Sequence, residues 1–423
     1  MIKKVPVEKL KVGMFIHDFN HKWKDPCCAG KDPGFLQGQK KLENETQLQL
    51  VIDHGLREVY IDTAKGLDCE EAPTSQEVEA QLAAQLAALD DEEFGSAKPV
   101  QKVTMLKELN KAAEVKSQAR RLVGNVLEDA RLGKQVAVGP VRDSVQNMVE
   151  SMLRNPDALL SLSLIKQKDE YTFMHSVNVG VFMISFCQSL GYTSEDVVDV
   201  GVGAVLHDIG KMKTPPEVLN KAGKLTDDEF KIMRQHVTFS KQILENSPGI
   251  SEISMHVASQ HHERYDGSGY PLGISGEAIN PFGQMAAIVD VYDAITSDRC
   301  YHKGNDPHLA LKRMLEWSKY HFNPTLYQQF VQCVGIYPIG TLVRLENGYL
   351  AVVIIPNKES LLFPVVKVVA DTKKNKPVHP VEVNLMEQQG KPGGFKIVGF
   401  EDPLKWGINT RQFLPSPEIF ANV

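Results

Sequence analysis

Histidine and aspartate are concentrated in the middle of the chain, where seven of the 13 histidines lie between His175 and His302. Five of these histidines and two aspartates have spacings that suit metal ligation: His175, His207, Asp208, His236, His261, His262 and Asp290. Seven ligands exceed the three or four of one catalytic zinc ion and suit two ions about 3.5–4 Å apart, bridged by a carboxylate and a hydroxide. The pattern therefore predicts a metal-dependent hydrolase acting on a phosphodiester.

The run AVLHDIGK places several chemically useful groups close together. On a helix, His207 and Asp208 point about 100° apart, so that both can converge on a metal pair from a single turn. Lys211 lies three residues after Asp208 on the same helical face, where it can meet a phosphate oxygen. Gly210 allows another backbone or a substrate to approach closely. Asp290 lies in an apolar helix, where its burial is costly unless a cation compensates its charge.

The types of ligand narrow the choice of metal. A set of imidazoles and carboxylates without a thiolate fits iron, manganese, nickel or zinc, and it disfavours a structural zinc knot. We expect two divalent ions, with iron or manganese first and nickel or zinc as alternatives. A single histidine is more often a core or surface residue than a ligand, so the prediction depends on the whole set.

The composition excludes several classes of protein. A hydrophobic content of 42% and a charged content of 24% are ordinary for a globular protein. The net charge of -6 argues against a DNA-binding protein, although a small anionic ligand responds to local charge. Neither a signal peptide nor an apolar run of the ~20 residues that a membrane span needs is found, so we expect a cytoplasmic protein.

The elements that must position these residues are predicted to be mainly helices. Apolar residues recur every three or four positions over residues 104–132, which predicts a long helix. This helix could pair with a partner chain, but packing within its own chain is favoured because its heptad pattern is impure. Asn347-Gly348 between apolar runs predicts a β-hairpin after the helical part. We expect four parts, covering residues 1–70 (a small α/β domain), 71–133 (linker and long helix), 134–335 (catalytic helices) and 336–423 (a β-rich extension).

The motifs HDIGK, HHERYDGSGYP and DVYDAITSDRCY resemble the signature of the HD-GYP family of cyclic di-GMP phosphodiesterases, over roughly residues 141–337. The first 70 residues resemble, more weakly, an accessory domain found before it, through LKVGMFI and GLREVYID. The resemblance implies a mainly α fold with an HD-type helical bundle. It also implies that the seven ligands named above hold the metals, with Asp208 as the bridge.

Further roles follow from the same resemblance. Asp208 and Lys211 match catalytic positions, and Lys211 and Arg299 match positions that hold the phosphates. Gly269, Tyr270 and Pro271 form a loop near the site that serves substrate recognition or partner contact; for Tyr270 a plain turn is an equal alternative.

The sequence departs from the family pattern at two places. Some members hold a third metal with a glutamate four residues before the first histidine, where this chain has Tyr171. Glu170 lies about 140° around the helix from His175, so we expect two ions rather than three. Where some relatives have a lysine near the substrate, this chain has His302, with Lys303 one position away.

The resemblance implies hydrolysis of cyclic di-GMP. In the reaction that it implies, a hydroxide held by the metal pair would attack phosphorus, the 3′ oxygen would leave and linear pGpG would form; a second cycle would yield GMP. One alternative is a cyclic di-GMP receptor with little turnover, and another is an HD hydrolase of a different nucleotide, such as a hybrid cyclic dinucleotide. A homodimer or a signalling protein would contact residues 104–132 or the Gly269-Tyr270-Pro271 loop.

Overall fold

The computed structural model consists of two compact units. It describes residues 1–20, 38–53, 56–89, 103–164, 171–221, 223, 225–297, 306–357, 360–391 and 393–415, without the side chains of residues 171 and 172. One unit comprises Met1–Leu86 and Gly223–Met233, and the other comprises Ala87–Ala222 and Arg234–Val423.

The first unit contains a small antiparallel sheet with the strand order β1-β4-β2-β3. Val59 and Ile61 of β4 are fully buried, as the alternation of a half-buried strand requires. The expected small α/β fold of this part is confirmed. The elements are β1 (Ile2–Pro6), η1 (Val7–Lys9), β2 (Phe15–Asp18), β3 (Lys40–Lys41), α1 (Glu45–Asp53), β4 (Glu58–Asp62) and α2 (Ser75–Ala88).

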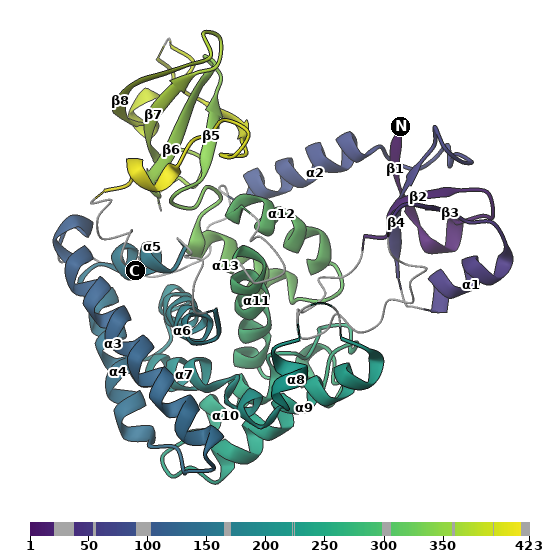
Figure 1. Cartoon of the computed structure of the whole chain (residues 1–423). Helices are drawn as coiled ribbons and strands as arrows, with labels where there is room; N and C mark the ends of the chain where they lie inside the picture. The colour runs from purple at the N-terminus through teal and green to yellow at the C-terminus, as the bar shows by residue number, and fades with distance from the viewer. Residues whose placement is uncertain are drawn as a thin grey trace. The chain divides into compact units, whose positions relative to one another are not determined.

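Helices make up most of the second unit, which confirms the mainly α prediction (Figure 1). No helix in the described ranges combines the length and the apolar character that crossing a membrane requires. The helices are α3 (Met105–Arg131), α4 (Val138–Arg154), α5 (Pro156–Leu164), α6 (Tyr171–Ser189), α7 (Ser194–Leu206), η4 (Ile209–Lys213), α8 (Pro216–Leu219), α9 (Asp227–Glu245, which begins in the first unit), α10 (Glu252–Gln260), η5 (Gly276–Ala278), α11 (Pro281–Thr296), α12 (Pro307–Ser318) and α13 (Pro324–Val334).

Two apolar helices, α6 and α11, form the centre of this helical bundle. Because they are apolar on every face, they are covered by other helices: α6 packs against α3, α4, α7, α11 and α13 (Figure 1). The long helix α3 is amphipathic, and its buried stripe, including Leu109, Ala112 and Ala119, packs against α4 and α5. Packing of this helix within its own chain, which the sequence favoured, is therefore confirmed.

A five-stranded antiparallel sheet with the order β8-β7-β6-β5-β9 follows the helices. Its first hairpin turns at Asn347-Gly348, where Gly348 has a φ of 90°, so the predicted hairpin and β-rich extension are confirmed. The elements are β5 (Leu342–Leu345), β6 (Tyr349–Ile355), β7 (Val365–Asp371), β8 (Lys376–Asn384), η6 (Met386–Gln388), β9 (Ile397–Phe400) and η7 (Thr410–Phe413).

Candidate metal centre

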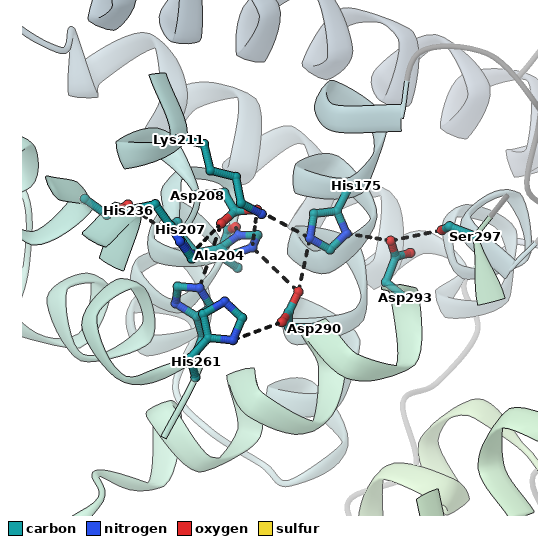
Figure 2. A network of polar contacts seen from close by, with 12 residues as sticks. His175, Ala204, His207, Asp208, Lys211, His236, His261, Asp290, Asp293 and Ser297 are labelled. Atoms are coloured by element: carbon teal, nitrogen blue, oxygen red, sulfur yellow. Dashed lines mark hydrogen bonds and ion pairs between the residues drawn. The ribbon is translucent and has the colours of Figure 1, made fainter. Parts of the chain in front are cut away.

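The seven predicted ligands come from six elements of the helical bundle and meet in its interior; Figure 2 labels all of them except His262. All are buried, with exposed fractions between 0% and 6%. Two pairs of adjacent residues, His207-Asp208 and His261-His262, lie where a helix ends, so their side chains are not constrained by a following helical turn. His175 lies on α6, His207 at the end of α7, Asp208 before η4, His236 on α9, His261 and His262 after α10, and Asp290 on α11.

The carboxylate of Asp208 lies between two pairs of histidines. Its Oδ2 is 3.7 Å from Nε2 of His175 and 3.3 Å from Nε2 of His207. Its Oδ1 is 3.3 Å from Nε2 of His236 and 3.9 Å from Nε2 of His261. Each oxygen therefore faces a different pair, which is the arrangement of a carboxylate that can bridge two cations.

The two carboxylate oxygens of Asp290 also face different histidines. Its Oδ1 lies 3.1 Å from Nε2 of His175 and 3.9 Å from Nε2 of His207, while its Oδ2 lies 3.9 Å from Nδ1 of His262. The α11 helix begins with Asn280 as its N-cap and Pro281 in its first turn, which fixes the start of the helix that carries Asp290. The predicted placement of this carboxylate in a buried apolar helix is correct.

Backbone carbonyls orient two of the imidazole rings. Nδ1–H of His207 donates to the carbonyl of Ala204 at 2.7 Å, and Nδ1–H of His261 donates to that of Ala258 at 2.9 Å. Because a carbonyl can only accept, these bonds fix the tautomer in which Nε2 carries a lone pair. Both rings are therefore prepared for ligation through Nε2.

Asp293 is a candidate site residue that the sequence interpretation missed. It is fully buried on α11, and its Oδ2 lies 2.8 Å from Nδ1 of His175. The hydroxyl of Ser297 donates to the same oxygen at 3.3 Å. The sequence did contain a signal, because Asp293 lies three residues after Asp290, on the same face of an apolar helix.

The carboxylates around His175 determine its charge. Burial alone would lower the pKa of His175, but hydrogen bonds with Asp290 and Asp293 raise it to about 10. Burial would raise the pKa of Asp208, yet Lys211 and His207 hold it well below its usual range. Without a bound cation, a proton on His175 thus offsets part of the buried negative charge.

Several buried atoms of the cluster point to a cation. Nε2 of His207, Nε2 of His261 and Oδ1 of Asp208 accept no hydrogen bond from the residues that the structure describes. Buried polar atoms are rarely left unsatisfied, and these three are lone-pair donors of the type that divalent transition metals bind. Ligand atoms close enough to share an ion form two groups, one of His236, His261 and His262 and one of His175, His207 and Asp208. The residues therefore fit two metal ions.

The backbone differs from the predicted single helical turn at His207 and Asp208. The α7 helix ends at Leu206, and Asp208, with φ -98° and ψ 8°, precedes the 3-10 helix η4. A Cβ on Gly210 would lie 2.0 Å from the carbonyl oxygen of His236, so this glycine permits η4 to pack against α9. Of the two roles considered for Gly210, the close approach of another backbone is the one observed.

Lys211 lies beside the predicted metal ligands. Its Nζ donates to Oδ2 of Asp208 at 2.5 Å, and the side chain is almost completely buried. The i to i+3 spacing brings the two side chains together because residues three apart lie above one another in a 3-10 helix.

The loop that contains Gly269, Tyr270 and Pro271 folds back onto the segment after α10 that contains His262 and Glu263. A Cβ on Gly269 would lie 2.5 Å from Cα of Glu263, so only glycine permits this approach. The backbone N–H of Tyr270 donates to the carbonyl of His262 at 3.1 Å, and their rings stack with centroids 4.6 Å apart. The Tyr270–Pro271 peptide bond is cis.

Several predicted positions lie outside the described residues. They are Arg299, Glu170, His302 and Lys303, together with the side chain of Tyr171, whose backbone begins α6. The interpretation of these residues remains a prediction.

Comparison with known proteins places the site in a family. Residues 160–326 match the family model of the HD domain, and residues 2–141 match a domain of unknown function. A cyclic di-GMP phosphodiesterase of Pseudomonas aeruginosa is 38% identical over 410 residues, which are 97% of this chain and 94% of that protein.

Two proteins of Vibrio cholerae are similar to about a third of the chain. A cyclic di-GMP phosphodiesterase is 41% identical over 134 residues, or 30% of this chain and 27% of that protein. A 3′3′-cGAMP-specific phosphodiesterase is 38% identical over 144 residues, or 34% of this chain and 33% of that protein. The motifs and the nearly full-length relative lead to one conclusion: the chain belongs to the HD-GYP family of metal-dependent phosphohydrolases.

Proposed function

We propose that this chain is a cytoplasmic phosphodiesterase that hydrolyses cyclic di-GMP with two divalent cations. The observation that carries the proposal is Asp208, whose two oxygens face different histidine pairs in a buried cluster. The substrate is taken from the Pseudomonas aeruginosa relative, which carries this activity in its name and matches almost the whole chain.

The ligands divide between two cation positions. His175, His207 and Asp290 would hold one cation, His236, His261 and His262 would hold the other, and Asp208 would contact both. When bound, the cations would lower the pKa of a water molecule and offset the charge on the scissile phosphate. Iron and manganese are the first choices for these ligands. A third ion is not expected, because Tyr171 replaces the glutamate that would bind it.

The chain's own residues would orient the substrate and stabilise the transition state. Lys211, held against Asp208, adds a positive charge at the edge of the cluster, where it would orient a phosphate oxygen. Arg299 would contact a second phosphate oxygen, as the family motif implies. Water attacks phosphorus, the bond from phosphorus to the 3′ oxygen breaks, and linear pGpG leaves; a second attack would yield GMP.

A second substrate is supported by the comparison with the 3′3′-cGAMP phosphodiesterase, which resembles a third of this chain at 38% identity. The two substrates differ in one base, and the metal cluster would contact phosphate rather than base. Assays of cyclic di-GMP and 3′3′-cGAMP at equal concentration, with the products separated by chromatography, would rank them. We expect a higher kcat/KM for cyclic di-GMP.

The test of the function uses anaerobically purified full-length protein loaded with Mn²⁺ or Fe²⁺. We expect conversion of cyclic di-GMP to pGpG, and its loss in His207→Ala. His256→Ala is the matched control, because His256 lies on α10 with 30% of its side chain exposed, near Glu252 and outside the cluster. Tight binding of cyclic di-GMP without turnover in the loaded protein would instead support a receptor and refute the enzyme.

A further inference from the structure

We propose that Tyr270 and Arg234 are positioning residues that set the orientation of the His262 ring and so complete one of the two metal positions. This inference rests on the proposed function, since it concerns the same cations. It assigns to the tyrosine of the Gly269-Tyr270-Pro271 loop a structural task at the metal, in place of substrate contact.

Three of the other proposed ligands, His207, His261 and His175, are oriented by hydrogen bonds at Nδ1. Backbone carbonyls hold the rings of His207 and His261, and the carboxylate of Asp293 holds that of His175. The ring of His262 is in contact with two other rings. Tyr270 stacks on it at 4.6 Å with an interplanar angle of 25°, and His261 lies 4.2 Å away. A flat aromatic surface restricts the rotation of an imidazole, because a turn about its last side-chain bond would collide with the stacked ring.

Tyr270 is itself held in place from two directions. Two hydrogen bonds hold its loop against the segment after α10. The backbone N–H of Tyr270 donates to the carbonyl of His262, and the N–H of Leu272 donates to Oε1 of Glu263 at 2.8 Å. From the neighbouring helix α9, the guanidinium of Arg234 lies over the Tyr270 ring, with Cζ 4.3 Å from the centroid. The stack therefore connects α9 to the segment after α10.

Arg234 lies on the helix that carries His236, and Tyr270 stacks on His262, which belongs to the same ligand group as His236. Arg234 lies two residues before His236, which belongs with His261 and His262 to one ligand group. A cation–π contact between Arg234 and Tyr270 thus fixes the distance between two elements that share one cation. Tyr270 is only 7% exposed, which leaves little of its ring available to a substrate.

The test measures metal binding rather than turnover. Mn²⁺ is titrated into full-length metal-free protein by calorimetry, and electron paramagnetic resonance distinguishes a coupled pair of ions from an isolated ion. Tyr270→Phe keeps the ring, so we expect two ions and the coupled signal. For Tyr270→Leu we expect one ion with unchanged affinity, a second bound about 10- to 100-fold more weakly, and an isolated-ion signal.

Two arginine variants serve as a second measurement if Tyr270→Leu does not fold. Arg234→Met keeps Tyr270 and removes the cation, so we expect the same ion to bind roughly threefold more weakly. Arg264→Met is the control, because Arg264 lies in the same loop as Tyr270 but its guanidinium Cζ is 5.9 Å from the centroid of the Phe322 ring; its loss should leave both affinities unchanged.

Several results would overturn the inference. Wild-type affinity for both ions in Tyr270→Leu and Arg234→Met would show that the stack does not position His262. An equal loss in Tyr270→Phe would assign the effect to the hydroxyl instead of the ring. Absence of cyclic di-GMP hydrolysis in wild-type protein with two bound ions would refute the proposed function alone, since the metal titrations decide the inference independently.

Discussion

Replacing Asp293 with asparagine tests how the helical bundle prepares His175 for a metal. The carboxylate is fully buried and lies 2.8 Å from Nδ1 of His175, so its hydrogen bond to the ring is not weakened by solvent. Asparagine has almost the same shape, so Asp293→Asn removes the charge without opening a cavity. The imidazole loses a negative partner that makes its Nε2 a better donor to a cation.

The magnitude follows from the kind of contact that is lost. Hydrogen bonds to charged groups contribute about 1.5–3 kcal/mol, and each 1.4 kcal/mol corresponds to a tenfold change in affinity. We therefore expect Asp293→Asn to bind one Mn²⁺ about 10- to 100-fold more weakly, in line with other residues behind metal-ligating histidines. Hydrolysis at low Mn²⁺ should fall by a similar factor and recover at high Mn²⁺.

The assay is a calorimetric Mn²⁺ titration combined with initial rates over a range of Mn²⁺ concentrations. Asp306→Asn is the matched control, because it makes the same change at the N-cap of α12, where Asp306 accepts from the N–H of His308. This control should leave the Mn²⁺ affinity unchanged. If Asp293→Asn bound both ions as tightly as the wild type, the role assigned to Asp293 would be refuted.

Two further predictions concern stability. Gly210→Ala would place a Cβ 2.0 Å from the His236 carbonyl oxygen, so we expect η4 to separate from α9, with thermal unfolding at a clearly lower temperature and no tight Mn²⁺ binding; a wild-type melting temperature would contradict this packing. Burial raises the pKa of Asp306 to about 6, against hydrogen bonds from His308 and Leu309 that lower it. The protonated Asp306 carboxyl therefore stabilises the fold fully below pH ~4, and this stabilisation is lost as the pH rises through about 6. The loss in the free energy of unfolding is up to about 3 kcal/mol. Asp306→Asn should thus unfold at a higher temperature than the wild type at pH 7.5 and at a similar temperature at pH 4; equal melting temperatures at both values would count against the raised pKa.

Much of the fold could be predicted from local patterns. The long amphipathic helix, the apolar helix around Asp290 and the hairpin at Asn347-Gly348 depend on periodicity and turn chemistry, which act over a few residues. The proposed ligands were chosen because seven residues of suitable type lie close together in sequence, and the structure places them in one buried cluster. Local patterns were sufficient for the helices and the hairpin because each of these is determined within a single element or turn, whereas the ligands were identified by residue type and come from six elements.

The remaining features depend on contacts between elements that are distant in sequence. The contact of Asp293 with His175 joins residues 118 positions apart, and the spacing of Asp293 from Asp290 does not show which distant residue its carboxylate contacts. The stack of Tyr270 on His262 depends on the fold of the loop between them. The break between His207 and Asp208 follows from the close packing of η4 at Gly210, which competes with the helical propensity of the segment.

The central claim is a pair of cations joined by Asp208, and metal analysis of anaerobically purified protein tests it most directly. Wild-type protein should contain two ions per chain and give the coupled signal after loading with Mn²⁺. Asp208→Ala should lose both ions and all hydrolysis of cyclic di-GMP together, because its carboxylate faces both histidine pairs. One ion or three ions in the wild type, or two ions retained in Asp208→Ala, would contradict the account.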